Sequence, residues 1–173
     1  NDNTPSAIAL SRQKVAYINP SNLKENKCEK GAYTVKITSH ENKVILVASG
    51  TEVELALKVQ EKLLENNIHS KVVSMPCMEI FDKQSKDYKK DILEEDSLIV
   101  TLEAGSISSW QKYIKHKGIN LGIDQFGESA PYKEVYNHHT VRSIEYMMKE
   151  YIQGIDKILN INETIQNNNW DDF

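Results

Sequence analysis

Two apolar runs constrain the fold of this chain most strongly. The first, at 44–48, reads VILVA, and the second, at 97–102, reads SLIVTL. A strand with one face in water alternates apolar and polar residues, whereas a strand covered on both faces can be apolar throughout. The two runs therefore predict central strands of a parallel sheet that is covered by helices on both faces.

Three further strands are predicted around these runs. Apolar and polar residues alternate over 33–37, Pro76 ends a strand predicted at 71–75, and Leu121 and Ile123 flank a glycine in a short β-like run. Because strands alternate with helices, we expect the α/β class. The expected architecture is a small doubly wound, mostly parallel sheet of four to five strands with helices on both faces.

Helical patterns fill the intervals between the strands. Thr51 and Glu54 have the spacing of a capping box, and they predict a helix that ends at 66–67. The inner face of that helix is expected to contain Val53, Ala56, Leu57, Leu63 and Leu64. Residues 85–93 predict a short charged helix on the surface. Further helices are expected from a second capping box at Ser108 and Gln111 to Lys115, at 131–136, and from Val141.

Charge and composition exclude two classes of partner. The chain has 21 basic and 25 acidic residues and a net charge of −4, which provides no basic surface for nucleic acid or an anionic membrane. No apolar run approaches the roughly 20 residues that span a bilayer. Cys28 and Cys77 lack a metal-binding spacing and are expected to be reduced thiols, so we expect a cytoplasmic protein. The first residue is Asn1 rather than methionine, so a targeting segment further upstream stays open.

Four polar groups are candidate sites. Gly50 opens a helix where a phosphate could bind, but Glu52 and Glu54 place two carboxylates in that first turn, so we interpret this corner as a helix cap. Glu103 and Asp124 follow two strands, where open α/β sheets place ligands, and either a carboxylate pair or structural hydrogen bonds to loop N–H groups would fit.

The remaining groups favour structural interpretations. His138 and His139 are adjacent and lack further ligands at metal-binding spacing. Ser129 lies in GESAP, which lacks the second glycine of a nucleophile elbow. With Asp124, Gly127 and Pro131, Ser129 fits a corner between a strand and a helix. Trp110 and Tyr113 are spaced for packing rather than for a binding platform.

Arg12 is the candidate binding residue. It is one of only two arginines in a lysine-rich chain, and it follows a short apolar run. A planar guanidinium at this position suits a phosphate or a carboxylate, and a surface salt bridge is the alternative.

Five ordered stretches of the chain resemble the transketolase family. They are ALSRQKV at 9–15, VILVASGTEVELALKVQEKL at 44–63, KVVSMPCMEIFDKQ at 71–84, VTLEAGSISSWQKYI at 100–114 and GIDQFGESAPYKEVY at 122–136. The resemblance implies the end of a pyrimidine-binding domain at 1–17, a linker at 18–32, the C-terminal domain at 33–153 and a tail at 154–173. At 106–110, SISSW lacks a glycine that often precedes this tryptophan in the family.

The resemblance also implies a function for the parent enzyme. Transketolases move a two-carbon ketol unit from a ketose phosphate to an aldose phosphate in the pentose phosphate pathway, with thiamine diphosphate and a divalent cation, Mg²⁺ or Ca²⁺. They are homodimers, and the arginine of the LSRQ motif, here Arg12, helps to bind the substrate's phosphate. The motifs for thiamine diphosphate and metal are absent from this chain. We therefore expect the fragment to be structural, to support the dimer, to bind neither cofactor nor metal, and to be inactive alone.

Two alternatives stay open from the sequence. The chain could be the terminal domain of another thiamine diphosphate enzyme, such as deoxyxylulose phosphate synthase or a pyruvate dehydrogenase beta subunit. The LSRQ and FGESAP stretches favour transketolase over both of these. The other alternative is a stand-alone dimerisation module without a catalytic parent.

Overall fold

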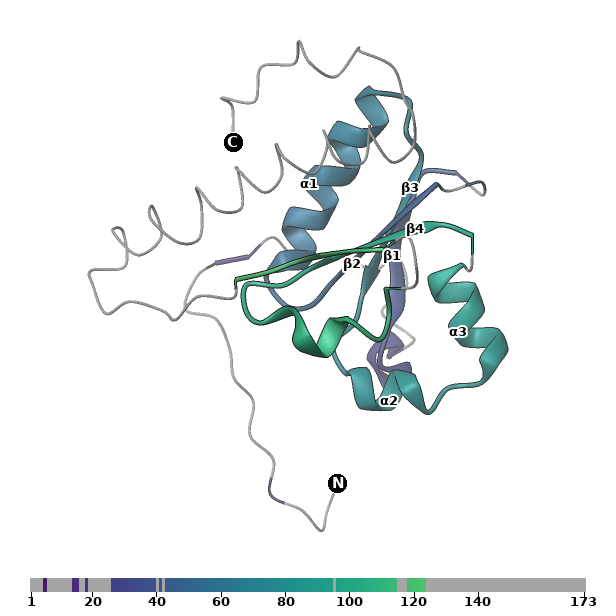
Figure 1. The fold of residues 1–173 in the computed structure, drawn as a ribbon, viewed down its shortest axis with the longest axis vertical. Helices are drawn as coiled ribbons and strands as arrows, with labels where there is room; N and C mark the ends of the chain where they lie inside the picture. Colours follow the sequence, from purple (N-terminus) through teal and green to yellow (C-terminus); the bar gives the residue numbers. More distant parts are fainter. Residues whose placement is uncertain are drawn as a thin grey trace, which may run out of the picture.

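A five-stranded sheet organises the domain (Figure 1). The computed structural model describes Pro5, Lys14, Val15, Ile18 and residues 26–39, 41, 43–94, 96–114 and 118–123. The strands are β1 (Tyr33–Ile37), β2 (Val44–Ala48), β3 (Ser70–Ser74), β4 (Leu98–Leu102) and β5 (Ile119–Leu121). The helices are η1 (Lys27–Lys30), α1 (Glu52–Glu65), α2 (Met78–Asp82), α3 (Lys86–Leu93) and η2 (Ile107–Trp110), where η marks a 3₁₀ helix.

The strand order is β1-β3-β2-β4-β5, and all neighbours are parallel except β1, which runs antiparallel to β3. The apolar runs form β2 and β4, which pair with each other, and every residue of both strands is buried. The predicted mostly parallel sheet is confirmed, and its bounds fall within one residue of the prediction for the first four strands. The short β-like run lies two residues further along than the observed β5.

Helices cover both faces of the sheet, as predicted (Figure 1). Alternate residues of β2 point to opposite sides: Val44 and Leu46 pack with the buried side of α1, whereas Ile45 and Val47 pack with Phe81 of α2 and the residues around α3 and η2. Each residue of this strand therefore contributes to one of two cores, which explains why the whole run is apolar.

The capping box predicted at Thr51 is wrong. Thr51 itself has helical backbone angles, φ −64° and ψ −29°, and its hydroxyl donates to the Glu52 carboxylate at 2.7 Å instead of accepting from the helix N–H groups. A capping side chain normally acts from a non-helical residue. The predicted inner face of α1 is correct at Val53, Ala56 and Leu63, but Leu64 is exposed.

The second predicted capping box is also wrong. Ser106, not Ser108, precedes η2, and its hydroxyl accepts a hydrogen bond from the Ser108 N–H. The short element is a 3₁₀ helix rather than an α-helix, and Lys115 lies outside the described residues. In contrast, the helix predicted at 85–93 is confirmed as α3, and the Ser85 hydroxyl accepts from the N–H of Tyr88.

Candidate functional site

The carboxyl ends of β2 and β4 meet at Glu103, which follows β4 directly. Its carboxylate oxygen Oε2 accepts hydrogen bonds from the Trp110 indole Nε1 at 3.1 Å and from the Ser49 hydroxyl at 3.4 Å. Trp110 is completely buried, so its single donor needs a partner inside the protein. Glu103 therefore joins the loop after β2, the end of β4 and η2 at one point.

A second carboxylate lies beside this junction, at the first residue of α1. Burial raises the pKa of Glu52 above its ordinary value, and the negative charge of Glu103 raises it further, while the Thr51 hydroxyl opposes the shift. Two carboxylates at this corner repel a phosphate that approaches the start of the helix. The electrostatics therefore agree with the interpretation that Gly50–Glu52 is not a phosphate site.

A further polar junction lies between α2 and the segment after η2. The Tyr113 hydroxyl donates to Oδ1 of Asp82 at 2.8 Å, and the Lys112 ammonium pairs with the other oxygen of Asp82. Hydrogen bonds from Lys112 and Tyr113 lower the pKa of Asp82, and burial together with the Asp82 contact raises the pKa of Tyr113 to about 12. These three side chains hold two separate segments together, since α2 and Tyr113 are both part of one core.

A buried ammonium connects β3 to α3. The side chain of Lys71 is 4% exposed, and its Nζ lies 2.5 Å from Oε1 of Glu94 and 2.7 Å from the carbonyl oxygen of Asp91. Carbonyls at a helix C-terminus carry partial negative charge, so the ammonium stabilises the end of α3 as well as the carboxylate. Lys71 thus acts as a structural link rather than as a free nucleophile.

The structure tests only some of the sequence candidates. Two roles were open for Glu103: a carboxylate pair or structural hydrogen bonds. It makes structural hydrogen bonds, but the donors are side chains rather than loop N–H groups. Trp110 and Tyr113 are packed in the core, as predicted. The other candidates lie outside the described residues: Arg12, Asp124, Gly127, Ser129, Pro131, His138 and His139.

Two structural partners were not predicted from the sequence. Charges of both signs are frequent in this chain, so Asp82 and Lys71 do not stand out by residue type. The Phe81-Asp82 pair within the stretch at 71–84 was the available signal, because Phe81 is completely buried and brings Asp82 beside Tyr113. Three of the stretches that resemble transketolase therefore meet in space, through Ser49 and Glu103 in one junction and through Asp82 and Tyr113 in the other.

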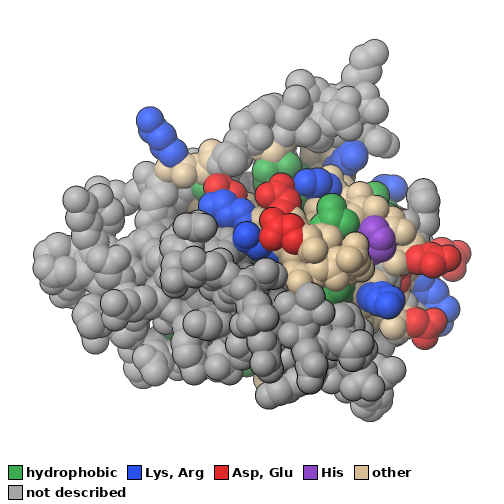
Figure 2. Space-filling view, turned by 90° about the horizontal axis from the view of Figure 1, so that it is seen from above, with side chains coloured by type: hydrophobic (Ala, Val, Ile, Leu, Met, Phe, Trp, Pro, Cys, Tyr) green, Lys and Arg blue, Asp and Glu red, His purple; other side chains and the backbone are tan. Residues whose placement is uncertain are grey.

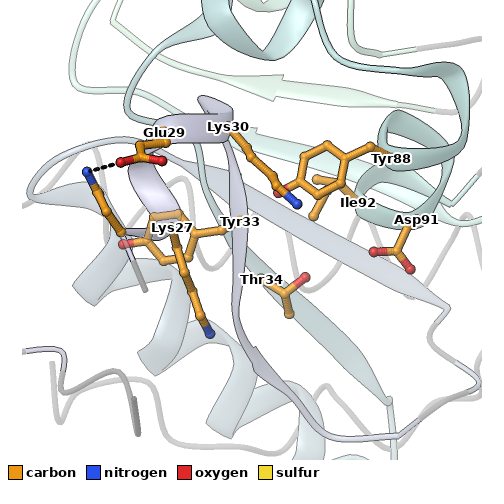
Figure 3. Close-up of a pocket in the computed structure, with 9 residues that line it drawn as sticks. Lys27, Glu29, Lys30, Tyr33, Thr34, Tyr88, Asp91 and Ile92 are labelled. Atoms are coloured by element: carbon orange, nitrogen blue, oxygen red, sulfur yellow. Dashed lines mark hydrogen bonds between the residues drawn. The ribbon is translucent and has the colours of Figure 1, made fainter. Parts of the chain in front are cut away.

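One open pocket of about 290 Å³ lies between η1, β1 and α3 (Figure 3). Its lining includes both signs of charge, from Lys27, Glu29, Lys30 and Asp91. The Lys30 ammonium lies 4.7 Å from the centre of the Tyr88 ring, and Figure 3 shows this side chain reaching across that ring. A pocket of mixed charge, in which one of the two lysines already contacts an aromatic ring, does not favour a particular ligand.

The surface is also of mixed charge. Figure 2 shows acidic and basic side chains next to one another on the described part of one face. Ion pairs along α1 join Lys58 to Glu54 at 3.4 Å and Lys62 to Glu65 at 3.3 Å. Among the described residues, no helix has the length and apolar character to cross a bilayer, and no group of three His, Cys, Asp or Glu side chains is arranged to hold a metal.

The fold and its two junctions define a class: a small, doubly wound α/β domain whose described polar side chains join its own elements. A family model described as the transketolase-like C-terminal domain matches residues 31–142. The chain therefore belongs to the transketolase family and carries its C-terminal domain.

Individual relatives support this assignment. The chain is 41% identical over 136 residues to a chloroplastic transketolase of Solanum tuberosum; the alignment covers 77% of this chain and 18% of the relative. It is 41% identical over 138 residues to a transketolase of Bacillus subtilis, over 78% of this chain and 21% of the relative. A transketolase structure from Pichia stipitis, a variant in complex with fructose 6-phosphate, matches with a TM-score of 0.63 and 30% identity, over 78% of this chain and 18% of that one.

These matches identify transketolase rather than the alternatives left open by the sequence. The matched family and relatives are transketolases, not deoxyxylulose phosphate synthase or a pyruvate dehydrogenase beta subunit. Since transketolases are enzymes, the match also disfavours a stand-alone dimerisation module without a catalytic parent. The chain spans only about a fifth of the length of these relatives.

Proposed function

We propose that this chain is the C-terminal part of a transketolase that transfers a two-carbon ketol unit between sugar phosphates. One observation carries the proposal: the family model matches residues 31–142, a range that includes all five strands of the domain. Of the described elements, only the 3₁₀ helix η1 lies before it. Related structures from Pichia stipitis are described as complexes with fructose 6-phosphate and xylulose 5-phosphate, which supports sugar phosphates as the substrate class.

Within that enzyme, the role of this domain is structural. The polar side chains of its two junctions bind partners within the domain, as in the Glu103–Trp110 and Asp82–Tyr113 pairs. Thiamine diphosphate and a divalent cation, Mg²⁺ or Ca²⁺, belong to the parts of the enzyme beyond this domain. A homodimer is the proposed assembly, and the domain contributes to the contacts between subunits.

Arg12 is the residue of this chain that we propose for substrate binding. In the full-length enzyme, Arg12→Ala should raise the Michaelis constant for phosphorylated substrates. A hydrogen bond between charged groups contributes about 1.5–3 kcal/mol, which corresponds to roughly a 10- to 100-fold change. Steady-state kinetics with a phosphorylated and a non-phosphorylated aldehyde acceptor measures the effect.

Lys14→Ala is the matched control, because Lys14 is an exposed cation only two positions away. This variant should leave both Michaelis constants unchanged. If Arg12→Ala weakens the two acceptors equally, Arg12 does not bind the phosphate. That result would leave the transketolase activity itself intact as a proposal, because the activity is measured separately with the unsubstituted enzyme.

A further inference from the structure

The two cysteines, distant in the sequence, lie on either side of one glycine. The N–H of Gly31 donates to the carbonyl oxygen of Cys28 at 3.0 Å, and the carbonyl oxygen of Gly31 accepts from the N–H of Cys77 at 3.1 Å. The first bond closes the last turn of η1, and the second precedes α2. A turn of this type keeps the Cα atoms of Cys28 and Gly31 within about 7 Å of each other, and the hydrogen bond from the Cys77 N–H places the Cys77 backbone against Gly31.

Both thiols are accessible. Neither cysteine is in a disulfide; Cys28 is exposed and Cys77 is partly exposed. The Cys77 thiol donates a weak hydrogen bond to the Glu79 carboxylate at 3.5 Å, at the surface. Turning this thiol away from Glu79 gives up only that weak contact, because a surface carboxylate regains its hydrogen bonds from water.

The helix that carries Cys28 lies on the surface of the domain. None of the four residues of η1 is buried. Gly31 anchors the end of η1 against α2, since a Cβ at this position would come within 2.3 Å of the Phe81 nitrogen. Formation of a bond between Cys28 and Cys77 requires η1 to rotate about Gly31 toward the start of α2.

We propose that Cys28 and Cys77 form a reversible intrachain disulfide when the protein meets a peroxide. The Cys28 thiolate attacks one oxygen of hydrogen peroxide, which breaks the O–O bond, forms a sulfenic acid and releases hydroxide; the hydroxide takes up the proton that the thiol lost and becomes water. The Cys77 thiol then attacks the sulfenic sulfur, forms the S–S bond and releases a second water. Both sulfurs are oxidised, the peroxide is reduced, and a dithiol such as dithiothreitol reverses the change.

The disulfide has a predictable structural consequence. It fixes η1 against the start of α2 in one position. Lys27, Glu29 and Lys30 of η1 line the pocket shown in Figure 3, so oxidation sets the shape of that pocket. The inference concerns this domain alone and does not depend on the proposed transferase activity.

The test is peroxide treatment of the intact protein under native conditions, followed by alkylation and peptide mapping without reductant. The expected product is one cross-linked peptide pair, Cys28 with Cys77, at a yield that does not change when the protein is diluted, and dithiothreitol should restore both thiols. Disulfides between molecules, or oxidation of Cys28 while Cys77 stays reduced, would overturn the proposal.

Two variants sharpen the result. In Cys77→Ser, Cys28 should still react with peroxide and accumulate as a sulfenic acid that dimedone traps. In Cys28→Ser, which changes an exposed side chain, Cys77 should remain a thiol for longer than in the unsubstituted protein. Equal rates of Cys77 oxidation with and without Cys28 would show that the two residues do not act together.

Discussion

Glu103 shows how a residue at a typical ligand-binding position can serve the fold instead. The carboxyl end of a central parallel strand is where open α/β sheets place ligands. Here the Glu103 carboxylate accepts from Ser49 and from the buried indole of Trp110. Both donors come from the domain itself, so the carboxylate's hydrogen bonds are used to position the loop after β2 and the 3₁₀ helix η2.

Trp110→Phe should lower the free energy of unfolding by more than the loss of side-chain volume alone would. The substitution retains an aromatic ring but removes the Nε1–H donor, and a hydrogen bond to a charged group contributes about 1.5–3 kcal/mol. Urea denaturation of Trp110→Phe, Glu103→Gln and the double variant measures this coupling. The two effects should be less than additive by roughly 0.5–3 kcal/mol, and strict additivity would show that the bond contributes nothing.

Tyr113 should make the stability depend on alkaline pH. Its pKa is raised from 10.0 to about 12 in the folded domain, first by burial and then by the bond to Asp82. Below pH 10 the phenol is protonated in both states. Above it, the unfolded chain loses the proton while the folded domain keeps it, so the free energy of unfolding falls as pH rises toward 12.

Tyr113→Phe is the matched variant for this prediction, because it keeps the ring and removes the titrating group. Denaturation at a series of pH values should show a shallower alkaline decline for the variant than for the unsubstituted domain. Other tyrosines contribute equally to both proteins. Identical declines would mean that Tyr113 titrates alike in the folded and unfolded states.

At the scale of elements, the contact between η1 and α2 depends on the absence of a side chain. Gly31 has φ +80°, and an added Cβ would lie 2.3 Å from the nitrogen of Phe81 and 2.4 Å from the carbonyl oxygen of Cys77. Both are backbone atoms, one within α2 and one in the residue before it, so they cannot turn away as a flexible side chain can.

Gly31→Ala should therefore cost more than Gly50→Ala. Gly50 also has a positive φ, +54°, but a Cβ there would meet nothing within 4 Å. The left-handed backbone alone costs about 1–2 kcal/mol for alanine, which is the effect expected at Gly50. Urea denaturation should show a clearly larger loss at Gly31, and equal losses would mean that α2 moves aside at little cost.

The elements differed in how far the sequence could predict them. The apolar runs of β2 and β4 were sufficient, because burial on both faces leaves a direct pattern in the residues. The alternation over 33–37 located β1, but Ile37 is exposed rather than buried. The helix caps could not be predicted from the sequence in this way. Thr51 and Ser108 had suitable spacing, but capping depends on backbone angles that the neighbouring strand and loop determine.

The junctions were harder to predict still. Glu103 was recognised as a candidate because it follows a buried strand, but its partners come from different parts of the chain. Lys71 had no sequence signal, since a lysine in a strand normally reaches water, and only the position of the end of α3 explains its burial.

At the scale of the whole molecule, the chain holds one domain of a larger enzyme family. We expect the isolated chain to show no ketol transfer when it is supplied with thiamine diphosphate, a divalent cation and sugar phosphates. The reason is that its sequence lacks the family's cofactor motifs, and its relatives are about four times as long. A coupled assay on the purified chain measures this, and thiamine-dependent turnover would contradict the prediction.

The directions of the outer strands have a mechanical consequence. Tyr33, where the chain enters β1, and Leu121, where it leaves β5, lie in one row across the sheet with Ser74, Ala48 and Leu102. Tension between these two points acts across the strands and loads the hydrogen bonds of β1 and β5 one after another, rather than all together. The domain should therefore peel open from its outer strands at low force, while the central pair β2 and β4 separates last.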